Sequence, residues 1–302
     1  MIPLTRNIDA GFPSNFTGSK KVEWERELLT DQRRIKRGEI EKHDFKSSSK
    51  TGRWKVTKEQ LKKETYDKCA YCEVHFSIVA YGDVEHYRPK SIYWWLAYAY
   101  ENYLPSCQIC NQKFKSDKFP RSGRKMKAPR ISKNPTDAFI ARKAGRLAPD
   151  LLDTAAGLPI NDFIDAHNTE RPLIINPYVD NPVDYFAYEI DDTKREVRVV
   201  PIDSSVEKFV EAAEEVYGIN RKELNELRYL HLLSFRIHRA TLEDSGISDT
   251  TRQLNQRGIL LLKSDRFPFA GMVRYFDTLQ NLPPIPDLDD IIFLSPLGGI
   301  IT

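Results

Sequence analysis

Apolar positions repeat weakly in the first part of the chain and strongly in the last part. In the first part we predict one helix over residues 22–37 and a loop over residues 44–53. Thr57 and Gln60 have the spacing of a capping box, in which the two side chains satisfy backbone groups at a helix start. This pattern predicts a short helix that ends near Lys68.

The middle of the chain predicts a loop, a buried strand and a hairpin. Residues 150–170 contain Pro159 and several Asp, a composition that favours a loop. The apolar run 172–175 predicts a buried strand. Residues 186–190 and 196–202 contain alternating apolar positions on either side of a short polar turn, so they predict a β-hairpin.

Helical periodicity dominates the remainder of the chain. A capping pattern at 204–207 begins a helix that Gly218 ends, and a second pattern at 220–223 begins a helix that runs to about residue 243. Two further helices are predicted near 250–262 and 267–281. A Pro-rich stretch and an apolar tail over 291–302 follow.

The composition is typical of a soluble globular protein. Of 302 residues, 40% are hydrophobic and 29% are charged. We find no run of about 18 apolar residues, and the first residues lack the charged-then-apolar order of a secretory signal. We therefore expect a cytoplasmic protein that does not interact with a membrane.

Charge is distributed unevenly along the chain. Residues 1–150 hold 31 Lys and Arg against 18 Asp and Glu, a net charge of +13, whereas residues 151–302 hold 15 against 25, a net charge of −10. This asymmetry favours a module that binds a polyanion joined to an acidic region.

The most basic stretch covers residues 118–133, where two Pro and one Gly argue against a long helix and favour a loop. A short helix over 135–144 should follow it. The cations of this stretch that we predict to contact nucleic acid are Lys118, Arg121, Arg124, Lys125 and Lys127.

The four cysteines form two Cys-x-x-Cys pairs, separated by 34 residues: Cys69 with Cys72, and Cys107 with Cys110. In a cytoplasmic chain such pairs indicate a metal site and not disulfides. Four thiolates complete a closed tetrahedral shell, so we predict a structural zinc ion. His75 is an alternative ligand, although four cysteines suffice.

Between and after the cysteine pairs lie polar residues in a defined order. Glu85 and His86 precede the second pair, Asn102 lies just before it, and Asn111 and Lys115 follow it. This order resembles that of the HNH endonucleases. In that family a strand ends in an acidic residue and His, a second strand carries an Asn, and a helix carries the last Asn.

The resemblance is closer to the PtuB-like HNH proteins of Septu and retron anti-phage systems. They share the segments Lys-Cys-Ala-Tyr-Cys-Glu at 68–73, Val-Glu-His-Tyr-Arg-Pro-Lys at 84–90 and Asn-Tyr-Leu-Pro-Ser-Cys at 102–107. The likeness covers about residues 55–230. It implies hydrolysis of phosphodiester bonds and a partner ATPase of the ABC/SMC-like type.

The resemblance also implies roles for single residues. His86 would be the general base, because imidazole takes a proton near pH 7. Asn102 would brace the loop that follows His86. Lys115, Arg88 and Lys90 would contact phosphate.

A divalent cation, expected to be Mg²⁺, would bind Asn111 and a carboxylate. The family pattern has Asp directly before the His, where this chain has Glu85. Either Glu85 or Asp83 is therefore the main carboxylate ligand. In an ideal strand the two carboxylates share one face and His86 points to the other.

We predict an α+β protein with a ββα-metal (HNH) core flanked by helices. Its parts are a basic segment (1–55), a nuclease domain (56–147) and an acidic, mainly helical region for partner docking (148–302). The substrate is nucleic acid, either DNA or RNA including tRNA. The alternatives without catalysis are a zinc-dependent nucleic-acid-binding module and a scaffold subunit.

Overall fold

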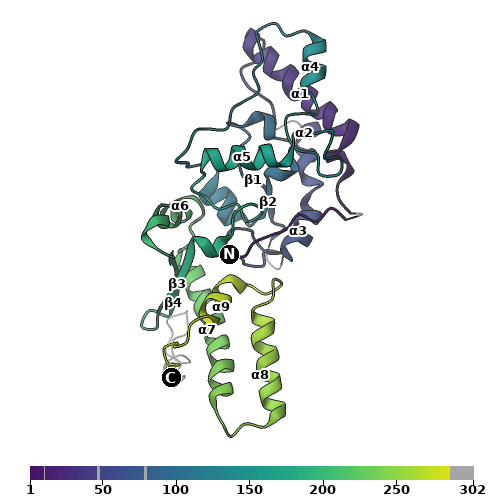
Figure 1. The fold of residues 1–302 in the computed structure, drawn as a ribbon. Helices are drawn as coiled ribbons and strands as arrows, with labels where there is room; N and C mark the ends of the chain where they lie inside the picture. Colours follow the sequence, from purple (N-terminus) through teal and green to yellow (C-terminus); the bar gives the residue numbers. More distant parts are fainter. Residues whose placement is uncertain (10, 46–47, 78–79, 286–302) are drawn as a thin grey trace, which may run out of the picture.

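The computed structural model describes residues 1–9, 11–45, 48–77 and 80–285, so the apolar tail predicted at 291–302 lies outside the described residues. The described part is a mixed α+β fold (Figure 1), which confirms the predicted class at this level. The helices are α1 Gly18–Arg37, α2 Ser48–Lys55, α3 Lys58–Thr65, α4 Asp137–Lys143, α5 Ile160–Glu170, α6 Glu207–Tyr217, α7 Lys222–Glu243, α8 Asp249–Leu262 and α9 Ala270–Asp277. The strands are β1 Asp83–His86, β2 Tyr103–Ser106, β3 Phe186–Asp191 and β4 Glu196–Pro201.

The strands form two antiparallel pairs. In the first, Asp83 of β1 lies opposite Ser106 of β2, and His86 lies opposite Tyr103. A π-helical segment, Ile109–Lys115, follows β2 directly. The second pair, β3 with β4, is the hairpin predicted from the alternating pattern.

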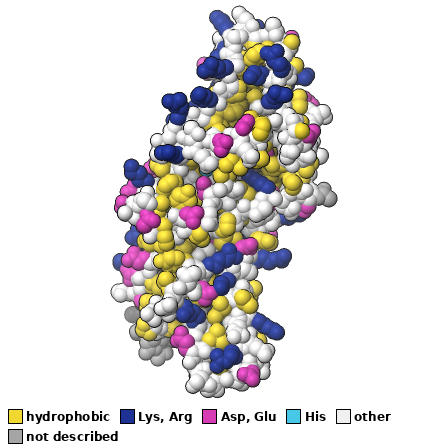
Figure 2. Space-filling view, in the orientation of Figure 1, with side chains coloured by type: hydrophobic (Ala, Val, Ile, Leu, Met, Phe, Trp, Pro, Cys, Tyr) yellow, Lys and Arg dark blue, Asp and Glu magenta, His cyan; other side chains and the backbone are white. Residues whose placement is uncertain are grey.

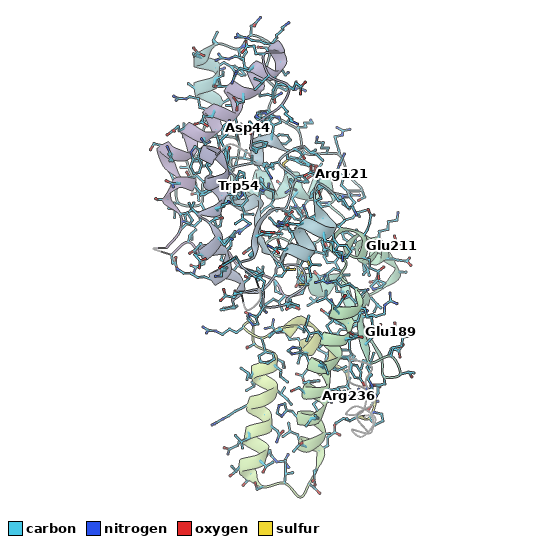
Figure 3. The ribbon with its side chains drawn as sticks, turned by 180° about the vertical axis from the view of Figure 1, so that it is seen from behind. Asp44, Trp54, Arg121, Glu189, Glu211 and Arg236 are labelled. Atoms are coloured by element: carbon cyan, nitrogen blue, oxygen red, sulfur yellow. The ribbon has the colours of Figure 1, made fainter. Side chains whose placement is uncertain are left out.

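One apolar cluster connects the basic and the acidic parts of the chain. It includes Leu29 of α1, Leu104 of β2, Phe163 of α5, Val216 of α6 and Phe276 of α9. Helices α7 and α8 form an antiparallel arm that projects from this core (Figures 1 and 3). No helix in the described ranges is both long and apolar enough to cross a membrane.

Two predicted loops contain helices. Helix α2 begins inside the segment 44–53 and ends beyond it, at Lys55. Helix α5 occupies the second half of the segment 150–170. In α5 the buried residues are Phe163, His167 and Glu170, which follow a helical spacing but include only one apolar side chain. The sequence prediction was wrong because this face is mostly polar.

The predicted strand at 172–175 is also wrong. Ile174 and Ile175 are buried, but the segment makes one isolated bridge, between Pro172 and Arg121. Its polar groups are satisfied individually: the Tyr87 hydroxyl donates to the Ile174 carbonyl (2.6 Å) and Leu173 N–H donates to the Pro120 carbonyl (2.9 Å). No continuous strand lies alongside it among the described residues, so burial alone produced the strand-like pattern.

The predicted helix caps differ in detail. The Thr57 hydroxyl donates to the Trp54 carbonyl (2.6 Å) and caps no helix, and α3 ends at Thr65 instead of Lys68. Asn220 also does not cap α7. Its side chain accepts from Val199 N–H (2.7 Å) and donates to the Val199 carbonyl (2.8 Å), extending the β4 edge. The predicted end of α6 at Gly218, in a left-handed conformation, is confirmed.

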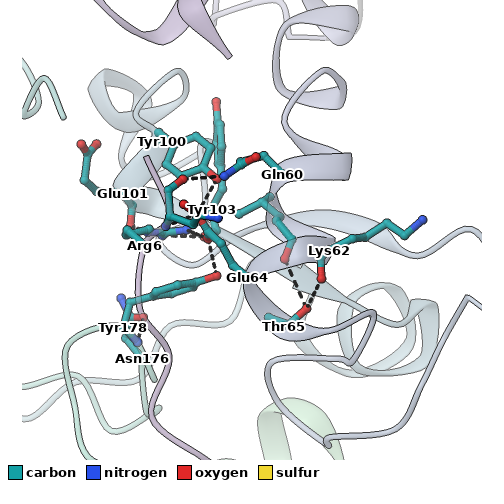
Figure 4. A network of polar contacts seen from close by, with 12 residues as sticks. Arg6, Gln60, Lys62, Glu64, Thr65, Tyr100, Glu101, Tyr103, Asn176 and Tyr178 are labelled. Carbon is teal, nitrogen blue, oxygen red and sulfur yellow. Dashed lines mark hydrogen bonds and ion pairs between the residues drawn. The ribbon is translucent and has the colours of Figure 1, made fainter. Parts of the chain in front are cut away.

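A buried network fastens the N-terminal segment to α3 and β2 (Figure 4). The Arg6 guanidinium pairs with Glu64 (3.1 Å) and donates to the Tyr103 carbonyl (2.8 Å). The hydroxyls of Tyr100 (2.9 Å) and Tyr178 (2.6 Å) donate to the same carboxylate. Glu64 is therefore the common acceptor for one cation and two tyrosines.

We predict that Glu64→Ala lowers the free energy of unfolding by about 3–5 kcal/mol, because it leaves the mostly buried Arg6 without its counterion. Glu59→Ala, on the exposed side of the same helix, is the control and should change stability by less than about 0.5 kcal/mol. Urea denaturation of both variants measures the difference. Equal effects would show that the network contributes nothing specific.

Candidate functional site

The four cysteines converge although 34 residues separate the two pairs. Their sulfur atoms all lie within 4.8 Å of one another, and the Sγ atoms of Cys72 and Cys107 are 4.0 Å apart. Cys69, Cys72 and Cys110 are buried and Cys107 is partly exposed. The described part of the chain contains no other group of three or more His, Cys, Asp or Glu placed to hold one ion.

Local backbone geometry sets the first cysteine pair. Lys68 and His75 form an isolated antiparallel bridge, and Cys69 N–H donates to the Val74 carbonyl (3.0 Å), which closes a tight turn around the thiols. Ala70 N–H donates to the Pro105 carbonyl (2.9 Å) and so fixes this turn to β2. The His75 Nε2 contacts the Arg266 carbonyl (3.1 Å). It is not part of the cluster, and the alternative of His75 as a ligand is dropped.

The cluster has the chemistry of a structural metal site. Four soft thiolates this close together suit a tetrahedral ion such as zinc and leave no position for water. Arg221 donates to Cys110 Sγ (3.5 Å), placing a positive charge beside a site rich in negative charge.

A hollow of about 270 Å³ lies beside β1 and the π-helical segment. Three of the residues predicted to act in catalysis or metal binding line it: Glu85, His86 and Asn111. The rest of the wall is formed by Trp54, Val84, Pro89, Lys90, Gln112, Ser116 and Asp117. Figure 3 shows the position of Trp54 beside the helices of the N-terminal part.

Glu85 and Lys115 form a buried ion pair at the inner edge of this hollow. Lys115 also donates to the His86 carbonyl (3.1 Å) and is fully buried. Burial raises the pKa of Glu85, and the Lys115 ammonium opposes that shift. The expectation that Lys115 contacts phosphate is corrected: its ammonium faces Glu85 and the strand, away from the surface.

His86 is held as a neutral imidazole. Its Nε2 lies 3.1 Å from the Ala97 carbonyl, which only accepts, so Nε2 carries the hydrogen and Nδ1 is the basic atom. Burial, aided by the nearby Lys90, lowers the pKa of His86 well below its usual range. The rings of Trp54 and Tyr103 pack against the imidazole in T-shaped arrangements, with centroid distances of 5.2 and 5.0 Å.

The two candidate carboxylates have different surroundings. Asp83 Oδ2 accepts hydrogen bonds from the side-chain amides of Asn111 (3.1 Å) and Gln112 (2.9 Å). Because Asn111 uses its amide nitrogen here, its Oδ1 remains as a ligand-type oxygen. Asp83 does not line the hollow, whereas Glu85 does.

Asn102 lies at the turn into β2 and is completely buried. Its Oδ1 accepts from Arg88 N–H (2.8 Å), and its Nδ2 donates to the carbonyls of Arg88 (2.9 Å) and Leu96 (3.3 Å). These bonds hold the backbone immediately after His86. Asn102 touches the loop and not the hollow, which is the geometry of a positioning residue.

The predicted phosphate contacts divide into buried and exposed groups. Arg88 is only 1% exposed, with its Nε donating to Glu170 (2.7 Å), so its expected contact with nucleic acid is corrected. The ammonium of Lys90 lies 5.2 Å from the Trp54 ring centroid at the wall of the hollow. Lys118 lies beside Glu215 of α6. The four other predicted nucleic-acid contacts, Arg121, Arg124, Lys125 and Lys127, are exposed.

Sequence reasoning missed three contributors to these sites. Trp54 lies in α2, just beyond the predicted loop, and no motif identified it. Gln112 follows Asn111 and shares Asp83 with it. Arg221 reaches the cysteines from a segment 111 residues further along the chain.

Comparison with known proteins gives one relevant similarity. The chain is 26% identical over 192 residues to the Septu protein PtuB of Bacillus mycoides (strain KBAB4), covering 57% of this chain and 49% of that protein. The chain therefore spans about half the length of the curated relative it matches. No family model matches the chain, and no solved structure matches it. The similarity supports a Septu-like defence relative.

We predict that the purified protein carries about one zinc ion per chain, because the four thiols are placed for a tetrahedral shell. Cys107→Ser should lose the metal and unfold, since it breaks the link between the two cysteine pairs. Ser116→Ala, an exposed change nearby, should retain both zinc and fold. Elemental analysis with circular dichroism tests this, and a well-folded protein free of zinc would contradict it.

Proposed function

We propose that this protein is a metal-dependent endonuclease of the HNH type, acting as the effector of an anti-phage defence system. The observation that carries the proposal is the hollow that brings Glu85, His86 and Asn111 together beside a hairpin, a helical segment and a four-cysteine cluster. This order of elements is what a ββα-metal core requires. The similarity to a Septu protein supports the defence role.

His86 is the proposed general base. Its neutral Nδ1 takes a proton from a water molecule, whose oxygen attacks the phosphorus as the bond to the leaving oxygen breaks. Asn102 and the Lys115 bond to the His86 carbonyl keep this loop in position. Lys90 and the exposed cations of the basic loop, residues 118–133, attract the phosphate backbone.

Asn111 Oδ1 and Glu85 are the proposed ligands of a divalent cation such as Mg²⁺, since both line the hollow and offer hard oxygen donors. When bound, this ion would supply positive charge to the scissile phosphate and the leaving oxygen. Asp83 is the second choice, because its Oδ2 already accepts two amide hydrogen bonds. Its role would be to orient Asn111.

The acidic region 148–302 is the proposed docking region for a partner ATPase of the ABC/SMC-like type. Five large apolar side chains of α7 and α8 are 43–66% exposed, which is typical of surfaces that partners cover: Leu230, Ile237, Leu254, Leu260 and Leu261. A scaffold or binding subunit without catalysis is the alternative. It would not require a neutral histidine beside a carboxylate and an amide in one hollow.

We predict that His86→Ala lowers the rate of Mg²⁺-dependent cleavage by roughly 100-fold or more, the usual scale for loss of a general base. Binding of the substrate should remain. His238→Gln, on the projecting arm, is the control and should retain full activity. Cleavage of plasmid DNA and of tRNA measures the effect and also identifies the substrate. Unchanged cleavage by His86→Ala would refute the assignment.

We predict a different defect for Asn111→Ala: a weaker apparent affinity for Mg²⁺, partly rescued by raising the Mg²⁺ concentration, because one ligand oxygen is lost. Glu85→Ala should show the same pattern more strongly, whereas Asp83→Ala should have the smaller effect. Magnesium titrations of the cleavage rate compare the three variants. A larger defect in Asp83→Ala would make Asp83 the main carboxylate ligand.

A further inference from the structure

A second and larger hollow, of about 470 Å³, lies between α5, the basic loop and the segment that follows α4. It shares no lining residue with the hollow that holds His86. One wall is α5, with Asp162, Phe163, Ala166 and Thr169 facing it. The cysteine cluster contributes no residue to it, and the proposed endonuclease shares with it only the basic-loop cations Arg124, Lys125 and Lys127.

The interior of this hollow is apolar and partly aromatic. Trp95, Leu147 and Phe163 line it and are each less than 7% exposed, so they form a fixed floor. Leu158, Met126 and Pro129 contribute at the sides. A floor of this kind accepts a flat apolar group by stacking and van der Waals contact.

The rim of the same hollow is strongly basic. Five cations line it and one acid, Asp162, accompanies them: Arg124, Lys125, Lys127, Lys143 and Arg146. Within the described ranges, Arg124, Lys127 and Arg146 form no ion pair. Figure 2 shows Lys and Arg side chains gathered around exposed hydrophobic surface in the part of the molecule that holds α1 and α4.

The basic loop is held against α5 and is therefore organised before any ligand arrives. Met126 N–H donates to the Glu170 carboxylate (2.8 Å), and Gly123 N–H donates to the Glu170 carbonyl (2.9 Å). Gly123 packs so closely that a Cβ there would lie 2.2 Å from the Thr169 carbonyl oxygen. A preformed site avoids the entropic cost of ordering a loop on binding.

We propose that this hollow binds one nucleotide unit, with the base against Trp95 and Phe163 and the phosphate among the cations of the rim. An apolar floor and a basic rim match the two ends of a nucleotide, and the volume lies in the range of small-molecule sites. The unit comes either from a free nucleotide or from an unpaired base of a nucleic-acid strand. The site is separate from the proposed cleavage site.

Binding of paired probes in buffer without divalent cations tests this inference. ATP is compared with tripolyphosphate, and a ten-nucleotide single strand is compared with an abasic strand of the same length. We expect the base-containing member of at least one pair to bind about tenfold or more tightly, the scale of one stacked base. A preference for ATP identifies a free nucleotide, and a preference confined to the strand identifies an unpaired base.

Matched variants locate the binding. Ala166→Trp fills the hollow from α5 and should weaken the base-dependent binding about tenfold or more, whereas Asn168→Trp on an exposed position of the same helix should not. Arg124→Ala with Lys127→Ala should weaken all anionic probes. Lys208→Ala with Arg257→Ala, two exposed cations elsewhere, is the control for charge.

Two results would overturn the proposal: equal affinity for probes with and without a base, or equal binding by Ala166→Trp and Asn168→Trp. His86→Ala should bind all probes as the unchanged protein does. If the unchanged protein shows base-dependent binding but cleaves neither plasmid DNA nor tRNA, the endonuclease proposal alone is refuted. Normal cleavage with no base-dependent binding would refute the nucleotide site alone.

Discussion

Convergence of the four cysteines is the constraint on which the rest of the candidate site depends. The first pair is fixed to β2 through Ala70 and Pro105, and the second pair lies where β2 passes into the π-helical segment. Two strands of four residues would be marginal alone in water. The cysteine cluster holds the end of β2 and the start of the helical segment in one place, and so sets where Asn111 lies relative to β1.

Buried ion pairs complete this frame. They also explain why Lys115 and Arg88 do not make the phosphate contacts predicted for them. Lys115 pairs with Glu85, and Arg88 pairs with Glu170. Burying the two charges of each pair costs desolvation free energy, so further hydrogen bonds to the charged groups are needed to offset that cost. Lys115 finds one at the His86 carbonyl, and Glu170 also accepts from Tyr93 (2.5 Å). Both cations are buried, so they stabilise the frame of the site and are not accessible to a ligand.

The sequence predicted features whose cause is local. The spacing within each Cys-x-x-Cys pair, the alternation in β3 and β4 and the glycine that ends α6 depend on neighbours within a few residues. Prediction from the sequence failed where contacts with a distant segment determine which residues are buried. Helix α5 is buried through His167 and Glu170 because Arg88, about 80 residues earlier, contacts both. Nothing near Arg88 in the sequence shows that its charge is neutralised by an acid so far along the chain.

The hydrogen bond between Arg88 and Glu170 also links the two hollows. Asn102 fixes the backbone of Arg88, two residues after His86, and the Arg88 side chain reaches Glu170. Glu170 then fixes Met126 in the basic loop that borders the second hollow. The carboxylate of Glu170 thus contacts the loop that follows His86 on one side and the basic loop on the other. Each step is a direct hydrogen bond between buried or half-buried groups, so the residues around the two hollows belong to one continuous hydrogen-bonded frame.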